Sequence, residues 1–253
     1  MSGVWAVVVA AGKGERLGHE LPKAFVRLTG RPLLAESLER LDESEWIEGI
    51  VVVCPDEWEE PTILLAEELG LGKVAAAVVG GATRAESVRL GVAEVPDEAA
   101  VILVHDAARP FLSDAVIERV VLGLGDGYDG AVPGLSVADT IKRVDAGGAI
   151  VETVDRSALR AVQTPQGFVA STFRRALASA DPAATDCASV LEAAGCRVRV
   201  VDGDPQLLKV TTPDDLERAR AILRAQGRDV DEPDWSGDDD EAWEDDDEPP
   251  GDG

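Results

Sequence analysis

Short apolar runs rich in β-branched residues alternate along this chain with stretches of helical periodicity, and this alternation restricts the fold more than any other feature. The apolar runs occur at residues 5–10, 50–54, 74–79, 101–104, 130–133 and 196–201. Near-continuous apolar runs of this length are typical of strands buried on both faces of a mostly parallel sheet. The sequence therefore predicts an α/β fold with three layers, in which helices cover both faces of the sheet.

The segments between the apolar runs carry helix signals. Residues 32–41 place four leucines on one helical face. Thr83 is followed three residues later by Glu86, which is the spacing of a capping box. Thr212 precedes a proline and two aspartates, which predicts an N-cap, a proline at the first helical position and acids near the positive end of the helix. Helices are therefore expected to begin near residues 83 and 212.

Residues 135–160 break the alternation of strands and helices. Two short alternating runs flank the sequence Asp145-Ala146-Gly147-Gly148, and this arrangement predicts a β-hairpin. We expect the hairpin to project from the sheet as an arm. Because a hairpin has little core of its own, the arm is expected to pack on something else.

Charge is distributed unevenly along the chain. The 49 Asp and Glu residues outnumber 24 Lys and Arg, and 14 of the acids lie in residues 229–253, which contain no Lys or Arg. We expect this tail (228–253) to be disordered, because it has too little apolar surface to offset the entropy of ordering, although Trp235 and Trp243 leave open docking on a partner. Residues 1–227 are expected to form one domain. The acidic balance argues against binding to nucleic acid.

Targeting and redox signals favour a cytoplasmic protein. No run of about 18 apolar residues occurs, so no membrane span is predicted. The first apolar run has no basic segment before it and is followed at once by Lys13 and Arg16, which is the reverse of a signal peptide. The three cysteines have no metal-like spacing, and their odd number argues against a disulfide framework.

A glycine-rich segment, residues 10–18, directly follows the first predicted strand. It matches neither the Walker A phosphate loop nor the dinucleotide-binding fingerprint. A plain structural turn would account for the glycines alone. However, Lys13, Arg16 and Lys23 gather within eleven residues at the carboxyl end of this strand, against the acidic balance of the chain. The clustering favours a polyphosphate site, because ligands of α/β sheets bind at this end of the strands.

Residues 10–18 followed by Leu21-Pro22-Lys23 resemble the signature of nucleotidyltransferases that activate sugars and alditols. Six further segments then occur in order, at residues 80–88, 104–110, 139–143, 164–166, 185–186 and 208–211. From residue 4 to about 225, the chain is similar to the 2-C-methyl-D-erythritol 4-phosphate cytidylyltransferase family. The resemblance implies a Rossmann-like nucleotidyltransferase fold. It also implies transfer of the cytidylyl group of CTP to the methylerythritol phosphate, with release of pyrophosphate, in non-mevalonate isoprenoid biosynthesis.

The resemblance also implies roles for individual residues. Catalytic roles, in stabilising charge on the phosphates or orienting the attacking phosphate, fall on Arg16, Lys23, Arg156 and Lys209. Recognition of cytosine and ribose falls on Ala10, Ala11, Gly12, Gly81 and Ser87. Further substrate contacts fall on Asp106, Arg109, Thr140, Thr164 and Thr185. Ala82 departs from some relatives, which carry an acid there, so any contact made by that acid is missing.

The chemistry of the implied reaction fits these residue types. Nucleotidyl transfer depends on positioning and charge stabilisation, and the attacking phosphate oxygen is already anionic, so no general base is required. We therefore expect His105 to be a core or turn residue and Cys187 a buried small residue. Asp106 ends a predicted strand, where its carboxylate is expected to hold Mg²⁺ against the phosphates, the alternative being a cap of the turn before Arg109.

Three points stay open or depend on the resemblance alone. In the family such arms exchange between two subunits, which implies a homodimer in which Thr140 and Arg156 serve the partner's site. Ribitol-5-phosphate cytidylyltransferase remains an alternative, because the shape of the pocket sets the length of the acceptor. A non-catalytic nucleotide-binding regulator on the same fold is a second alternative, which the retention of all the charged site residues argues against.

Overall fold

The structure is a computed structural model that describes residues 3–12, 21–28 and 30–227, so Arg16 and the acidic tail lie outside the described residues. In chain order the elements are β1 (Val4–Val9), η2 (Lys23–Phe25), α1 (Leu33–Glu43), β2 (Gly49–Cys54), α2 (Glu59–Glu68), β3 (Val74–Val79), α3 (Arg84–Ala93), β4 (Val101–Asp106), α4 (Asp114–Leu122), β5 (Gly130–Ser136), β6 (Ile141–Val144), β7 (Ile150–Val154), η3 (Arg156–Ala158), β8 (Arg160–Val162), β9 (Gln166–Val169), α5 (Ala170–Leu177), α6 (Cys187–Ala193), β10 (Val198–Asp202) and α7 (Pro213–Ala225). Among the described helices, none has the length and apolar character needed to cross a bilayer.

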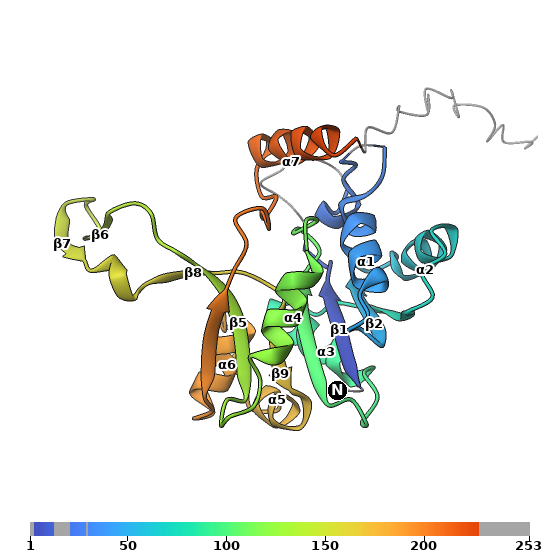
Figure 1. Cartoon of the computed structure of the whole chain (residues 1–253), viewed down its shortest axis with the longest axis horizontal. Coiled ribbons are helices and arrows are strands. Elements are labelled where there is room, and N and C mark those ends of the chain that lie inside the picture. Colours follow the sequence, from blue (N-terminus) through green and yellow to red (C-terminus); the bar gives the residue numbers. More distant parts are fainter. Residues whose placement is uncertain (1–2, 13–20, 29, 228–253) are drawn as a thin grey trace, which may run out of the picture.

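A mixed, mostly parallel sheet forms the centre of the molecule (Figure 1). Its strand order is β10-β5-β9-β4-β1-β2-β3, with β8 added on β5. All neighbours pair in parallel except β9, which runs antiparallel to β4 and β5, and β8, which runs antiparallel to β5. The prediction of an α/β fold with a mostly parallel sheet is therefore confirmed.

The apolar runs predict that every strand is buried on both faces, and this prediction is wrong for two strands. β2 and β4 are buried along their whole length, but β3 and β10 are largely half-buried. These two strands lie at the edges of the sheet, where one side has no neighbouring strand among the described residues. An apolar run alone does not distinguish an edge strand from a central one.

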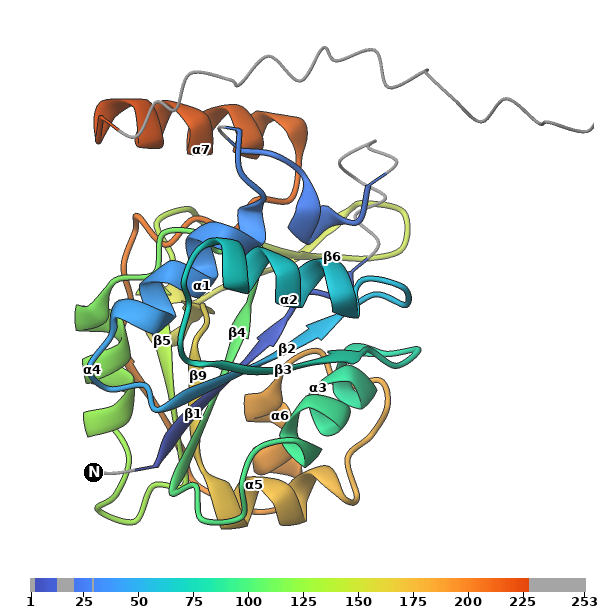
Figure 2. The same ribbon diagram turned by 90° about the vertical axis from the view of Figure 1, so that its right-hand side faces the viewer.

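Helices cover both faces of the sheet and give the three predicted layers (Figure 2). Side chains alternate along β1: Val4, Ala6 and Val8 join one hydrophobic cluster with α1 and α4, whereas Val7 joins another with α3, α5 and α6. This alternation follows from the two-residue period of a strand. β1 is therefore anchored from both sides, and its carboxyl end is held in a fixed position.

Helix α7 packs outside these layers, against Val26, Leu28, Leu33 and Phe111. It begins as the sequence predicts, because the Thr212 side chain accepts from the backbone N–H of Asp215 and the Asp215 carboxylate accepts in return from Thr212. The predicted capping box at α3 is only half formed. Thr83 accepts from the Glu86 N–H, but the Glu86 carboxylate accepts from Ala82 rather than from Thr83.

The predicted arm is present and projects from the sheet (Figure 1). Strands β6 and β7 pair antiparallel and form a separate two-stranded sheet, which is joined to the body through β5 and β8. The Asp145 carboxylate stabilises the hairpin turn by accepting from the backbone N–H groups of Gly147 and Ala149, each at 2.9 Å. Large apolar side chains on the arm remain exposed, with Ile150 at 65% and Val151 at 64%.

Candidate functional site

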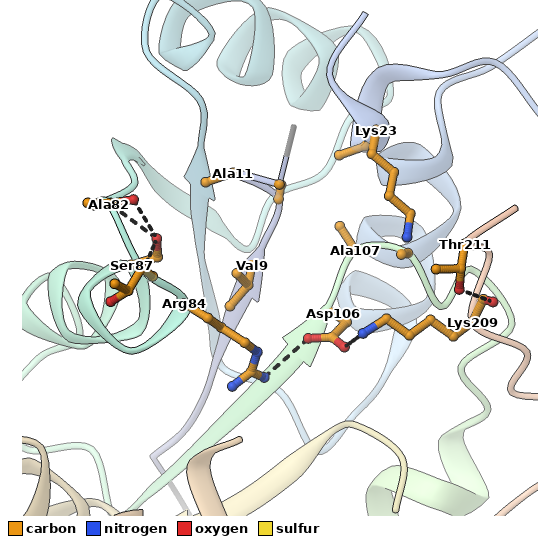
Figure 3. Close-up of a pocket in the computed structure, with 16 residues that line it drawn as sticks. Val9, Ala11, Lys23, Ala82, Arg84, Ser87, Asp106, Ala107, Lys209 and Thr211 are labelled. Carbon is orange, nitrogen blue, oxygen red and sulfur yellow. Dashed lines mark hydrogen bonds and ion pairs between the residues drawn. The ribbon is translucent and has the colours of Figure 1, made fainter. Parts of the chain in front are cut away.

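A cavity of about 790 Å³ opens where β1 and β4 end (Figure 3). Its lining comes from five segments that are distant in sequence: residues 9–12, 23–24, 81–84 with Ser87, 106–108, and Lys209 with Thr211. Both central strands point their carboxyl ends at this edge because they pair in parallel. The cavity therefore lies where α/β sheets bind their ligands.

The glycine-rich turn supplies main chain to one wall of the cavity. Ala10 continues the line of β1, and its N–H donates to the Val53 carbonyl at 2.7 Å. Gly12 lines the cavity, and no atom of the described residues would lie within 4 Å of a Cβ added there. Among the described residues, no side chain therefore separates an approaching ligand from the main chain of Gly12.

A second glycine turn, before α3, lies beside the first and also lines the cavity. A Cβ on Gly80 would lie 2.4 Å from the Cβ of Ala11, so a residue with a side chain would push the two turns apart. The Ser87 hydroxyl accepts from the Gly81 N–H at 3.1 Å and donates to the Thr83 carbonyl at 2.9 Å. Ser87 is 3% exposed, so its hydroxyl holds the turn in shape as well as facing the cavity.

The Asp106 carboxylate lies between two cations on the floor of the cavity (Figure 3). Its Oδ1 accepts from Arg84 at 3.2 Å, and its Oδ2 accepts from the Lys209 ammonium at 2.8 Å. Burial alone would raise the pKa of the Asp106 carboxyl, but the charges of Arg84 and Lys209 outweigh burial and hold that pKa well below its usual range. Asp106 is therefore ionised at neutral pH.

Lys23 approaches the cavity from a different direction. It begins the short helix η2, directly after Pro22, and its side chain lines the cavity. Figure 3 shows its ammonium pointing toward Ala107 and the segment that carries Thr211. Three cationic side chains from η2, α3 and the loop before α7 thus converge on one cavity in an otherwise acidic protein.

His105 and Cys187 are buried, as the sequence predicts. His105 is fully buried, and burial lowers its pKa to about 4, so the imidazole is neutral. Its Nε2 lies 3.2 Å from the Arg109 carbonyl and must donate to it, which leaves Nδ1 to accept from the Thr164 hydroxyl at 3.3 Å. Burial likewise raises the pKa of the Cys187 thiol to about 11, and that thiol lies 3.4 Å from Arg84.

Only some of the site residues that the resemblance implies line the cavity. Ala10, Ala11, Gly12, Lys23, Gly81, Ser87, Asp106 and Lys209 line the cavity. Thr164 and Arg109 lie behind it: the Thr164 hydroxyl accepts from the Asp106 N–H at 3.0 Å, and Arg109 donates to the Leu207 carbonyl at 2.9 Å. Thr185 is exposed outside the lining, and Thr140 and Arg156 are exposed on the arm. Arg16 lies outside the described residues.

Arg84 is the residue that sequence reasoning missed. It occupies the first position of α3, after the Thr83 cap, and its guanidinium reaches both Asp106 and Cys187. Residues 80–88, which begin with two glycines, were recognised as a motif, but the motif gave no reason to select the Arg84 side chain. The pairing depends on α3 lying beside the end of β4, which only the folded chain shows.

The donor set at this edge fits a magnesium ion held jointly with a substrate. Within the described part of the chain, no group of three or more His, Cys, Asp or Glu side chains could hold a metal ion by itself. Asp106 is a single ionised carboxylate facing the cavity. Mg²⁺ is commonly bound by one or two protein carboxylates together with substrate phosphates, so this carboxylate suits an ion that arrives with a nucleotide.

This fold and cavity define a class of enzyme, the nucleotidyltransferases, in which a glycine turn and converging cations at the end of a parallel sheet hold a nucleoside triphosphate. Residues 4–225 match the family model of 2-C-methyl-D-erythritol 4-phosphate cytidylyltransferase, IspD. The chain belongs to this family.

Individual relatives agree with that assignment. The enzyme of this name from Rhodococcus jostii (strain RHA1) is 48% identical over 220 residues, which cover 87% of this chain and 95% of that protein. The one from Saccharopolyspora erythraea is 46% identical over 224 residues, covering 87% and 99%. The crystal structure of the Thermus thermophilus cytidylyltransferase superimposes with a TM-score of 0.69 at 33% identity, covering 86% of this chain and 98% of that one.

Proposed function

We propose that the protein transfers the cytidylyl group of CTP to 2-C-methyl-D-erythritol 4-phosphate and releases pyrophosphate, as the name of its family describes. The observation that carries the proposal is the convergence of three cations, Lys23, Arg84 and Lys209, on one cavity that is walled by two glycine turns and contains the ionised Asp106. The cations suit the triphosphate and the acceptor phosphate. The exposed main chain of the turns suits hydrogen bonds to the nucleoside.

The reaction needs positioning and charge stabilisation rather than a base. A phosphate oxygen of the acceptor attacks the α-phosphorus of CTP, and negative charge develops on the α-phosphate and the departing pyrophosphate. Lys23, with Arg16, is assigned to that charge, and Lys209, with Arg156, to the attacking phosphate. His105 takes no part as a base, because it is fully buried and both its ring nitrogens are hydrogen-bonded.

We assign Asp106 as the protein ligand of Mg²⁺. The ion would supply positive charge that offsets the negative charge of the CTP phosphates. Asp106 is kept ionised by Arg84 and Lys209 and has its main chain fixed by Thr164, so its carboxylate is ready to accept a further cation. The assignment is tested by titrating Mg²⁺ against pyrophosphate release in Asp106→Asn, which should need far more Mg²⁺ than the unaltered protein.

We propose a homodimer in which each arm serves the partner's site. Two observations support this: Thr140 and Arg156 lie on the arm, away from the cavity of their own chain, and the arm leaves Val144, Ile150 and Val151 more than half exposed. Burial of such side chains favours association. Sedimentation that gives a monomer at micromolar concentration would refute the dimer.

We also propose a cytoplasmic location, with which the free state of all three cysteines accords.

The substrate is tested by incubating the protein with CTP, Mg²⁺ and either 2-C-methyl-D-erythritol 4-phosphate or D-ribitol 5-phosphate, and following pyrophosphate release. Release with the methylerythritol substrate alone is expected. Release with ribitol phosphate instead would keep the mechanism but change the acceptor. Release with neither, while CTP still binds, would favour a nucleotide-binding regulator.

A further inference from the structure

Lys209 lies on a segment that has no regular secondary structure, between β10 and α7. Its side chain is 43% exposed, yet its ammonium is directed at Asp106 at 2.8 Å. A long, half-exposed lysine on an irregular segment loses considerable rotamer entropy when it is held in one place. The main chain that carries it must therefore be fixed by contacts elsewhere.

Besides the Arg109 bond to the Leu207 carbonyl, three of those contacts come from one buried amide, that of Gln163. Its Nε2 donates to the carbonyls of Asp204 and Leu207, at 2.9 and 3.3 Å, and its Oε1 accepts from the Asp204 N–H at 3.0 Å. Gln163 is 6% exposed, so these bonds are shielded from water. The close fit extends to Gly203, where an added Cβ would lie 2.4 Å from the Gln163 Oε1.

The backbone of Gln163 is itself anchored. It directly follows β8, and its N–H donates to the Pro133 carbonyl of β5 at 2.7 Å. On the far side of Lys209, the Val210 N–H donates to the Ala108 carbonyl at 2.8 Å. The segment 204–210 is thus held at one end by the sheet through Gln163 and at the other by the residues that follow Asp106.

We infer that Gln163 is a positioning residue for Lys209. Its amide fixes the main chain of residues 204–207, so that the Lys209 ammonium is held where it can contact the attacking phosphate in the cavity. This inference rests on the proposed function, because Lys209 is assigned there to the attacking phosphate. Gln163 touches no cavity surface itself and acts only through the segment that it holds.

The test compares Gln163→Glu with Gln206→Glu. Gln163→Glu keeps the size of the side chain but replaces the donating amide group by a carboxylate oxygen that faces two carbonyls. Gln206→Glu makes the same chemical change on an exposed side chain of the same segment. With CTP, Mg²⁺ and the methylerythritol phosphate, Gln163→Glu should lower kcat/KM for the acceptor about 10- to 100-fold, because small misplacements of a positioning group cost this much. Gln206→Glu should leave it unchanged.

A double-mutant cycle separates positioning from a general loss of structure. In a Lys209→Met background, Gln163→Glu should add little further loss, because the group that it positions is already gone. Equal losses in both backgrounds, or a KM for CTP that rises as much as that for the acceptor, would overturn the inference. If Gln163→Glu does not fold, Gln163→Met removes the same hydrogen bonds without adding charge and is measured instead.

The outcomes distinguish this inference from the proposed function. Unaltered protein that releases no pyrophosphate would defeat the proposed function, and the inference with it. Active unaltered protein together with a fully active Gln163→Glu would defeat the inference alone.

Discussion

The neutral, buried state of His105 makes stability depend on pH in a window where few other groups titrate. Burial lowers the pKa of His105 to about 4 in the folded protein, against about 6.5 in the unfolded chain. Between these values the unfolded chain binds a proton that the folded protein does not, so stability rises with pH and is lost as pH falls. The shift predicts a loss of about 2 kcal/mol in the free energy of unfolding between pH 7 and pH 5.

The assay is denaturant unfolding followed by tryptophan fluorescence at several pH values from 7 to 5. His105→Gln should remove most of this pH dependence, because glutamine can donate to the Arg109 carbonyl and accept from Thr164 but does not titrate. The measured quantity is the slope of the free energy of unfolding against pH. A loss of stability that is the same at every pH does not change this slope. The other histidine provides the control, His19→Gln. A His105→Gln protein that keeps the slope of the unaltered protein would refute the reasoning.

Three further predictions concern the cation site, a helix cap and the tail. Lys23→Ala should lower kcat by about 100-fold or more while calorimetry still detects CTP binding; unchanged kcat would contradict the role of Lys23. Thr83→Ala should lower the free energy of unfolding by about 1 kcal/mol, because the Thr83 hydroxyl caps α3, whereas Thr83→Ser should not; equal losses would argue against the cap. Deletion of residues 228–253 should leave turnover unchanged, and a large loss would show that the tail takes part.

Much of this protein is determined by local patterns in its sequence. The apolar runs predicted the strands β1, β2, β3, β4, β5 and β10, because strands of a parallel sheet are typically continuous apolar runs, although β3 and β10 are only half-buried at the edges. The alternating runs around residues 145–148 predicted the arm, and Thr212 with its proline predicted the start of α7. These features depend on residues a few positions apart, so the sequence displays them directly.

Only the tertiary structure shows the contacts between residues that are distant in sequence, because these contacts depend on the order of the strands in the sheet. The strand β9 (Gln166–Val169) begins with Gln and Gly and so has no continuous apolar run by which to recognise it, and it inserts antiparallel between β4 and β5. That order lets Thr164 reach the main chain of Asp106 from 58 residues away. It likewise brings Gln163 to the segment that carries Lys209, and the packing of α3 brings Arg84 to Asp106. Such pairings are fixed by the folded sheet and not by local periodicity, because their strength depends on burial and distance, which no short stretch of sequence contains.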